Sequence, residues 1–308
     1  MIVPMVKIPG QFEMMFPLAA DHWRCLYSCS MAEYKARGDI ELLRKMYPSM
    51  KKYIKACKFW AGLFSAPKSK RIWKLLFHYG DWCAPDMGYK DWMKRGKWTG
   101  TACLAHSSGI VSEIAGVLGE TEEAEEYMKL SQETARAYRN ILMDENCHIK
   151  GGDFQTAFVL PLYYNMLSGN DKKKTAANLV NLIRDNNYNI KTGFPGTPYV
   201  LFALADNGYL EDAYKMLLAD TCPSWLYEVK AGADDMWGAL GCLRRMAAAI
   251  WGRTTEAVEW YPSTIMQMVQ WGISFTDVFW GLKPQREDIR HFALHRSLAA
   301  AFPGQKEM

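Results

Sequence analysis

The middle of the chain repeats apolar positions with the period of an α-helix. Residues 100–119 show this most clearly, and their large apolar residues recur at Ile110, Ile114, Val117 and Leu118. Gly119 predicts the end of this helix, because glycine readily adopts the left-handed conformation that stops helices. Thr121 predicts the cap of the next helix.

Residues 122–142 form that next predicted helix, with glutamates in the first turn and arginine near the end, as the helix macrodipole favours. Short breaks of Gly, Asn and Asp separate further helical segments at 153–167, 172–185, 197–208 and 210–220. No alternating strand pattern appears, so the sequence predicts an all-α fold of helical hairpins in series. An α/α toroid, a tetratricopeptide-like solenoid and an irregular bundle all fit. A solenoid predicts a constant period, which the chain lacks.

Composition narrows the classes of function. The 308 residues are 49% hydrophobic, enough for a substantial core, and the net charge of +4 arises from charges of both signs. No basic stripe interleaves with aromatic residues, which argues against nucleic-acid binding. No apolar run reaches about 18 residues, which argues against a membrane span. Residues 1–12 lack the pattern of a signal peptide. The oligomeric state is left open.

The eight cysteines are scattered, and only Cys25 and Cys29 lie close together. No histidine cluster accompanies them, so we interpret them as reduced thiols of a cytoplasmic protein, not as disulfides or metal ligands. Twelve Trp and sixteen Tyr make the chain rich in aromatic residues. Aromatic rings build hydrophobic cores and also stack on the apolar faces of sugars, so composition alone leaves both roles open.

An ordered series of motifs points to one family. The series begins with YPSMKKYI (47–54), FHYGDWCAP (77–85) and residues 100–130, and continues with QTAFVLPLYYNML (155–167), residues 179–218 and CPSWLYEVKAGADDMW (222–237). In this order and spacing the chain resembles the catalytic domain of bacterial α-L-rhamnosidases, from about Arg37 to Trp237. The resemblance implies a partial (α/α)6 toroid of helical hairpins. Residues 1–237 are then an incomplete six-hairpin glycosidase domain, and residues 238–308 are its C-terminal tail.

The resemblance implies inverting hydrolysis of a terminal α-L-rhamnose in a glycan or glycoside, with no metal or organic cofactor. Inversion uses two carboxyl groups roughly 6.5–9.5 Å apart, one protonating the leaving oxygen and one activating water. In the family the general acid precedes the segment that matches Met1, and the general base is a glutamate at the place of Gly238. Glycine accepts no proton from water. We therefore assign no catalytic residue and predict that the chain as written is inactive.

The resemblance assigns substrate contacts to four residues, Asp81, Trp82, Trp225 and Trp237. Asp81 and Trp82 match a Gly-Asp-Trp motif whose tryptophan packs against rhamnose in the family. Closing a helix end is the alternative role for Trp82. Trp225 and Trp237 lie near the family's pocket, and a place in the core fits each of them equally well.

Several neighbouring residues are predicted to be structural. Gln155 precedes a helix, His106 lies on one, and the loop 192–197 (TGFPGT) contains glycines that permit a positive backbone dihedral angle. The adjacent carboxylates Asp234 and Asp235 are not a designed pair in this interpretation. A makeshift general base there is the weaker alternative, because the acid partner is missing.

The tail suggests a cause for these departures from the family. Residues 261–276 (YPSTIMQMVQWGISFT) can be written in codons that, read one base earlier, give VSFNHYANGAVGDFLY. That peptide resembles the segment that follows the general base in the family. Residues 238–241 and 23–33, when their codons are read one base later, also give residues that resemble the family. We interpret the chain as a frame-disturbed, N-terminally incomplete reading of an α-L-rhamnosidase gene. Ordinary divergence is the alternative, and resequencing the source DNA decides between them.

Two other classes of function stay open. A non-catalytic carbohydrate-binding or scaffolding α/α protein predicts weak rhamnose binding without turnover. A helical-repeat interaction protein predicts an open superhelix without a central pocket, and the ordered rhamnosidase motifs argue against it.

Overall fold

The computed structural model describes residues 24–63, 66–67, 70–74, 80–87 and 89–230. Throughout these ranges the regular structure is helical, and extended pairing is confined to an isolated bridge between Met143 and Ile149. The predicted all-α fold is confirmed. Trp237, the acidic pair at 234–235 and the tail 238–308 lie outside the described residues.

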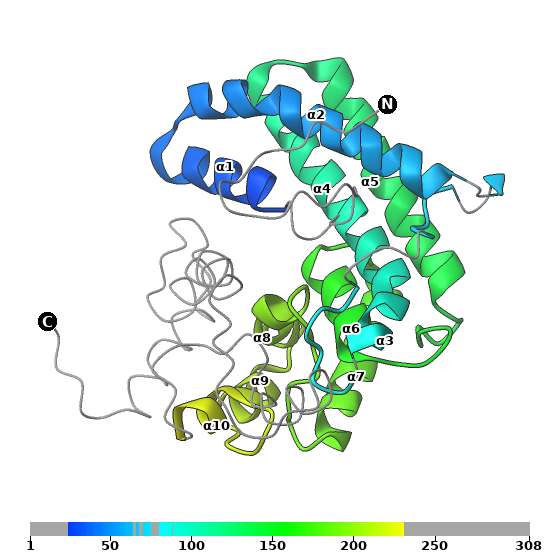
Figure 1. Ribbon diagram of the computed structural model, residues 1–308, viewed down its shortest axis with the longest axis vertical. Helices are drawn as coiled ribbons and strands as arrows, with labels where there is room; N and C mark the ends of the chain where they lie inside the picture. The colour runs from blue at the N-terminus through cyan, green and yellow to red at the C-terminus, as the bar shows by residue number, and fades with distance from the viewer. Residues whose placement is uncertain (1–23, 64–65, 68–69, 75–79, 88, 231–308) are drawn as a thin grey trace, which may run out of the picture. The chain divides into compact units, whose positions relative to one another are not determined.

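The described helices pair into hairpins (Figure 1). The first members of the pairs are α1 (Arg24–Arg37), α4 (Gly96–Leu118), α6 (Gln155–Tyr163) and α8 (Val200–Ala205). Their partners are α2 (Ile40–Gly62), α5 (Thr121–Ala137), α7 (Gly169–Asp185) and α9 (Leu210–Leu217). Each first member packs against the first member of the next pair, and we call these helices the first row and their partners the second row. The shorter helices α3 (Tyr89–Trp92) and α10 (Trp225–Lys230) precede the second hairpin and follow the fourth.

The turn between α4 and α5 follows the sequence pattern in part. Gly119 ends α4 with a φ of 84°, and its N–H donates to the carbonyls of Ala115 and Gly116. The prediction that Thr121 caps α5 is wrong, because Thr121 is already the first helical residue. The cap position falls on Glu120, whose side chain makes no capping bond.

Helices α4 and α5 approach closely because α4 presents small residues to its partner. The Ser131 hydroxyl on α5 donates to the Ala105 carbonyl at 2.7 Å, and the Ser112 hydroxyl on α4 donates to the Ala124 carbonyl at 2.6 Å. A Cβ added at Gly109 would lie 3.3 Å from the Ser131 hydroxyl. Larger residues at these α4 positions would therefore separate the two helices.

Helix α4 is also apolar enough to be weighed as a membrane span. Among the described residues, the stretch Met93–Leu118 passes the tests of length and hydropathy, and 61% of its most apolar window is buried against the rest of the protein. Buried core helices of globular proteins have the same character. Helix α4 packs against α1, α2, α5 and α6, which accounts for its composition.

Consecutive second-row helices are joined by a recurring polar contact. The third residue of three of these helices is an acid: Glu123 of α5, Asp171 of α7 and Asp212 of α9. A base from the preceding second-row helix, or from the turn directly after it, binds each acid: Lys51 at 2.9 Å, Arg139 at 2.7 Å and Arg184 at 2.7 Å. We call these contacts the second-row clasps. Each acid lies in a first helical turn, where the macrodipole also favours negative charge.

A second donor completes each clasp. The Tyr47 hydroxyl donates to Glu123, the Cys147 thiol to Asp171 and the Tyr188 hydroxyl to Asp212. The clasps therefore fix how each hairpin is placed against the next one.

Helix α6 contains a proline whose missing donor is replaced from a neighbouring element. Pro161 has no N–H to offer the carbonyl four residues earlier, which belongs to Ala157. The Tyr138 hydroxyl donates to that carbonyl at 2.7 Å instead. Tyr138 begins the π-helical turn η3 (Tyr138–Leu142) that follows α5, and both it and Ala157 are fully buried.

Candidate functional site

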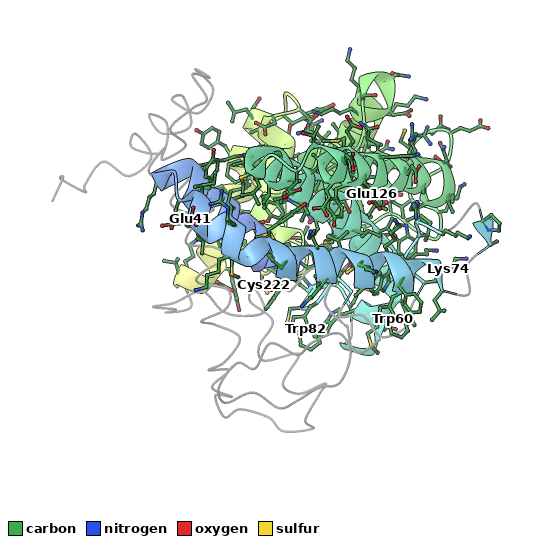
Figure 2. The ribbon with its side chains drawn as sticks, turned by 90° about the horizontal axis from the view of Figure 1, so that it is seen from above. Glu41, Trp60, Lys74, Trp82, Glu126 and Cys222 are labelled. Carbon is green, nitrogen blue, oxygen red and sulfur yellow. The ribbon has the colours of Figure 1, made fainter. Side chains whose placement is uncertain are left out.

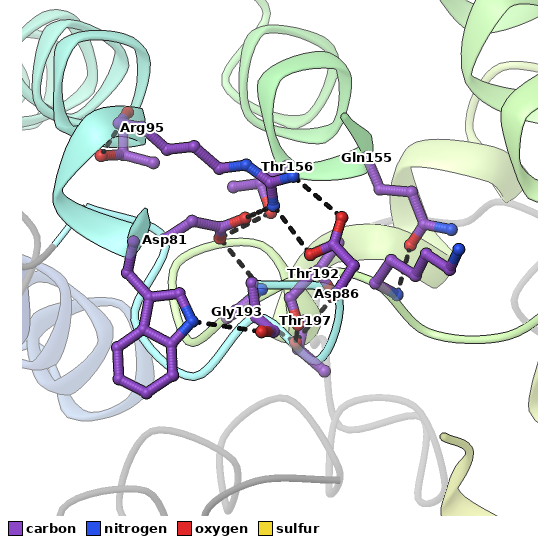
Figure 3. A network of polar contacts seen from close by, with 12 residues as sticks. Asp81, Asp86, Arg95, Gln155, Thr156, Thr192, Gly193 and Thr197 are labelled. Carbon is purple, nitrogen blue, oxygen red and sulfur yellow. Dashed lines mark hydrogen bonds and ion pairs between the residues drawn. The ribbon is translucent and has the colours of Figure 1, made fainter. Parts of the chain in front are cut away.

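The Asp81 carboxylate is the centre of a buried polar network (Figure 3). One oxygen accepts from the Thr156 hydroxyl at 2.7 Å and from the Gly193 N–H at 2.9 Å. The other oxygen accepts from the Arg95 guanidinium at 2.9 Å. Asp81 is 0% exposed, so these three donors come from the protein interior. Three separate parts of the chain meet at this one side chain.

Arg95, directly before α4, forms ion pairs with two carboxylates. It ends the short 3-10 helix η2 (Met93–Arg95), directly before α4 begins. Besides Asp81, its guanidinium binds Asp86 through two bonds of 3.0 and 2.8 Å. The guanidinium also lies 4.3 Å from the centre of the Phe154 ring. Both acids near this point are therefore engaged by the same cation.

Burial raises the pKa of Asp81 to about 6, whereas the charge of Arg95 and the bonds from Thr156 and Gly193 act to lower it. A buried carboxyl with both oxygens already bonded does not reach a sugar in solution, so the sequence-based prediction that Asp81 contacts substrate does not fit this structure. The arrangement suits Asp81 to holding its neighbours in place and not to exchanging protons with substrate.

The backbone around Asp81 is packed too closely for side chains at two glycines. A Cβ at Gly193 would lie 2.3 Å from the Trp82 carbonyl oxygen and 2.5 Å from the Asp81 carbonyl oxygen. A Cβ at Gly80, which has a φ of 63°, would lie 1.7 Å from the Trp92 carbonyl oxygen. These glycines are required by the approach of other backbone segments.

The sequence reasoning about the 192–197 loop is wrong in one respect. Neither of its glycines adopts a positive φ, and Gly196 has a φ of −98°. Lack of space explains the glycine at position 196 instead, because a Cβ there would lie 2.8 Å from the Thr156 hydroxyl. The loop is further closed by the hydroxyls of Thr192 and Thr197, which are 2.7 Å apart. Its predicted structural role fits these contacts.

The segment 189–197 joins several parts of the site. Gln155, 1% exposed, donates to the Asn189 carbonyl at 3.1 Å and accepts from the Lys191 N–H at 2.8 Å. This confirms the prediction that Gln155 is structural. The Ile190 N–H donates to the Pro223 carbonyl at 3.0 Å, and the Phe194 N–H donates to the Trp82 carbonyl at 2.8 Å.

Trp82, which Figure 2 labels, is half-buried. Its ring rests edge-on against Trp92, with 4.9 Å between the ring centroids. Trp92 is 2% exposed, and its indole N–H donates to the Ala84 carbonyl at 3.2 Å. Phe194 and Met87 pack against the same small cluster. Trp82 thus presents part of an aromatic ring on a rigid base.

Trp225 lies outside the 189–197 segment, at the start of α10. It is the first residue of α10 and is 9% exposed, as a core residue would be. The Ile190–Pro223 bond ties its neighbourhood to the segment whose other end contacts Trp82. His106 is half-buried and stacks on Tyr164 with 3.8 Å between ring centroids, which agrees with its predicted packing role. Within the described ranges, no three His, Cys, Asp or Glu side chains gather as metal ligands.

Comparison with known protein families assigns the chain to one of them. The family described as the bacterial alpha-L-rhamnosidase 6 hairpin glycosidase domain matches residues 3–249. The chain belongs to this family. The hairpins described above are therefore part of the (α/α)6 toroid of an α-L-rhamnosidase domain. This family of domains belongs to the glycosidases, which are hydrolases.

Relatives of known name are also α-L-rhamnosidases. The protein of Streptomyces avermitilis is 31% identical over 67% of this chain and 18% of its own length. That of Formosa agariphila is 30% identical over 66% of this chain and 21% of its own length. The chain thus spans about a fifth of the rhamnosidases that it matches.

Solved rhamnosidase structures have the same arrangement of helices. The Streptomyces avermitilis enzyme complexed with L-rhamnose superimposes with a TM-score of 0.67 and 26% identity, covering 85% of this chain and 23% of that one. The enzyme from Dictyoglumus thermophilum gives a TM-score of 0.59 and 25% identity over 70% of this chain and 23% of that one. The rhamnosidase of Aspergillus terreus, at 22% identity and a TM-score of 0.67 over 82% of this chain and 28% of its own, shares the fold.

Proposed function

We propose that this rhamnosidase-family chain binds the terminal α-L-rhamnose of a glycan or glycoside at Trp82. The observation that carries the proposal is the half-buried Trp82 ring, held on a rigid base by Trp92, Phe194 and the buried Asp81 network. A sugar's C–H face is apolar and packs flat on such a ring. Family membership and a relative solved with L-rhamnose support the choice of sugar.

We further propose that this 308-residue polypeptide hydrolyses rhamnosides slowly or not at all. Inverting hydrolysis needs a general acid and a general base. Asp81, next to Trp82 in sequence, and Asp86, four residues further on, are both bound by Arg95. Gly238 stands at the place that the family resemblance gives to the base. Loss of one acid or base group typically costs about 10²–10⁴ in rate, and loss of both costs more.

The first experiment measures binding and turnover separately. L-rhamnose binding is followed by calorimetry for the wild-type chain, for Trp82→Ala and for Trp60→Ala. Trp60 is a matched control, because it is a half-buried tryptophan on α2 whose described ring contact is with Phe59 (Figure 2). We expect Trp82→Ala alone to abolish binding. Absence of binding by the folded wild type, or equal loss in both variants, would overturn the proposed ligand.

Turnover is measured on p-nitrophenyl α-L-rhamnopyranoside, beside a longer version that supplies both family carboxylates. We expect only the longer version to release nitrophenol. Release by the 308-residue chain itself, at a rate comparable to the longer version, would overturn the proposed inactivity. Binding without turnover in both versions would instead support the non-catalytic carbohydrate-binding role.

A further inference from the structure

We propose that Asp81 is a positioning residue that fixes Trp82 for the sugar without contacting the sugar itself. The proposal rests on the proposed function, because it concerns the rhamnose surface at Trp82. Asp81 is 0% exposed, and both of its oxygens accept hydrogen bonds from the protein. A direct contact between this carboxylate and a ligand is therefore excluded in the folded chain.

The first step of the argument is that Asp81 joins three elements that are independent in sequence. Arg95 lies directly before α4, Thr156 is the second residue of α6, and Gly193 lies in the loop before α8. Each gives one donor to the carboxylate. Loss of the carboxylate leaves the buried donors of Thr156 and Gly193 and the part-buried Arg95 without their common acceptor, so the three elements lose this link.

The second step concerns the backbone of Trp82. Its carbonyl accepts from the Phe194 N–H at 2.8 Å, and the adjacent Asp81 side chain accepts from the Gly193 N–H at 2.9 Å. Two neighbouring residues are thus bonded to two neighbouring residues of the other loop. The absence of a side chain at Gly193 allows this approach. The Trp82 backbone is consequently held against the 192–197 loop.

The third step concerns the ring. The Asp81 N–H donates to the Trp92 carbonyl at 3.2 Å, and the Trp92 ring supports the Trp82 ring. Asp81 therefore contacts the loop that holds the half-buried Trp82 through its side chain, and Trp92 behind it through its backbone N–H. A positioned group that is displaced by about 1 Å can lose about 10²-fold of its effect on a bound substrate. The carboxylate acts on the Trp82 ring through the Trp82 backbone, which the Gly193 and Phe194 bonds hold against the 192–197 loop.

The test compares three variants: two that change the Asp81 network, and one control that changes a buried aspartate elsewhere. Asp81→Asn removes the charge and one acceptor, and Thr156→Val removes one donor while keeping the side-chain shape. Asp212→Asn is the control, because Asp212 is also a buried aspartate bound by the Nε and a terminal nitrogen of an arginine, in a second-row clasp. The 308-residue chain carries 5-fluorotryptophan, and Trp82→Phe assigns the Trp82 fluorine resonance.

We expect Asp81→Asn to shift or broaden the Trp82 resonance and to weaken L-rhamnose binding by about tenfold to a hundredfold. Thr156→Val should move the same resonance with a smaller loss of affinity. Asp212→Asn should lower the unfolding midpoint and leave the Trp82 resonance in place. An unchanged resonance and affinity in folded Asp81→Asn would overturn the proposal, as would an equal change in Asp212→Asn.

The outcomes remain distinguishable from a failure of the proposed function. If the wild type does not bind L-rhamnose, the ligand is wrong, and the resonance comparison still decides whether Asp81 positions Trp82. If Asp81→Asn does not fold, Thr156→Val decides the proposal, because it changes one bond of the network. An unmoved Trp82 resonance in that variant would then count against it.

Discussion

The backbone N–H of Gly193 donates to the Asp81 carboxylate at 2.9 Å, although 112 residues separate the two in sequence. The bond crosses from the segment before the second hairpin to the segment before the fourth. It brings two loops so close that the carbonyls of Asp81 and Trp82 occupy the space where a side chain at position 193 would lie. The half-buried Trp82 is therefore supported by a long-range contact.

Replacement of Gly193 by alanine should disrupt this contact. The new Cβ would meet two backbone oxygens at 2.3 and 2.5 Å, and backbone atoms cannot turn aside as a side-chain tip does. We expect a loss of about 2 kcal/mol or more in the free energy of unfolding, measured by urea denaturation. Gly116→Ala on α4 is the control, since a Cβ there meets nothing within 4 Å. It should be neutral or stabilise by up to about 1 kcal/mol. Equal effects of the two substitutions would contradict the close approach.

The stability contributed by Asp81 should fall as the pH rises. Burial raises the pKa of Asp81 from 3.8 to about 6. Between these values the folded state retains a proton that the unfolded state has lost, so stability declines with pH. The contribution is present in full below about pH 4 and is lost above about pH 6, a change of about 3 kcal/mol. Unfolding of wild type and Asp81→Asn at pH 4 and pH 7 measures it. A wild-type advantage that grows with pH would show that Arg95 outweighs burial.

The stability contributed by Asp212 should change with pH in the opposite direction, rising as the pH rises. The Arg184 guanidinium, which donates to both carboxylate oxygens, holds the pKa of Asp212 below its ordinary value. Its contribution is present above the unfolded pKa and is lost as the pH falls through the lowered folded value. The advantage of wild type over Asp212→Asn should therefore shrink on acidification, and that over Asp81→Asn should grow. Slopes of the same sign would contradict one of the two assignments.

The local parts of the fold follow from the sequence, and the site does not. Helices α4 and α5 were predictable because a hydrophobic stripe and a glycine stop act within a few residues. The predicted helix 122–142 differs from the structure at its end, where α5 stops at Ala137 and a π-turn takes over. The Asp81 network joins residues 75 and 112 positions apart. Only the resemblance of the Gly-Asp-Trp motif indicated that Asp81 and Trp82 belong to a site.

The two second-row clasps whose base is an arginine should differ in the stability lost when that arginine is replaced. The Asp212 side chain is 5% exposed, so Arg184→Met leaves a buried carboxylate with the Tyr188 hydroxyl as its remaining described donor. The Asp171 side chain is 39% exposed, so water can hydrate it in Arg139→Met. We expect Arg184→Met to cost clearly more of the free energy of unfolding than Arg139→Met, measured by urea unfolding. The reverse order would show that the bond from Arg139 to the Asp144 carbonyl matters more than burial of the acid.

A double-mutant cycle tests the replacement of the proline's missing donor. Tyr138→Phe leaves the fully buried Ala157 carbonyl without the hydroxyl that now donates to it at 2.7 Å, and should cost about 1–3 kcal/mol of stability. Pro161→Ala supplies a helical N–H to the same carbonyl. Tyr138→Phe should therefore cost less in the Pro161→Ala background, with a coupling of about 1 kcal/mol between the two changes. Urea unfolding of the four proteins measures it. Strictly additive effects would mean that the tyrosine hydroxyl does not act as the substitute donor for Ala157.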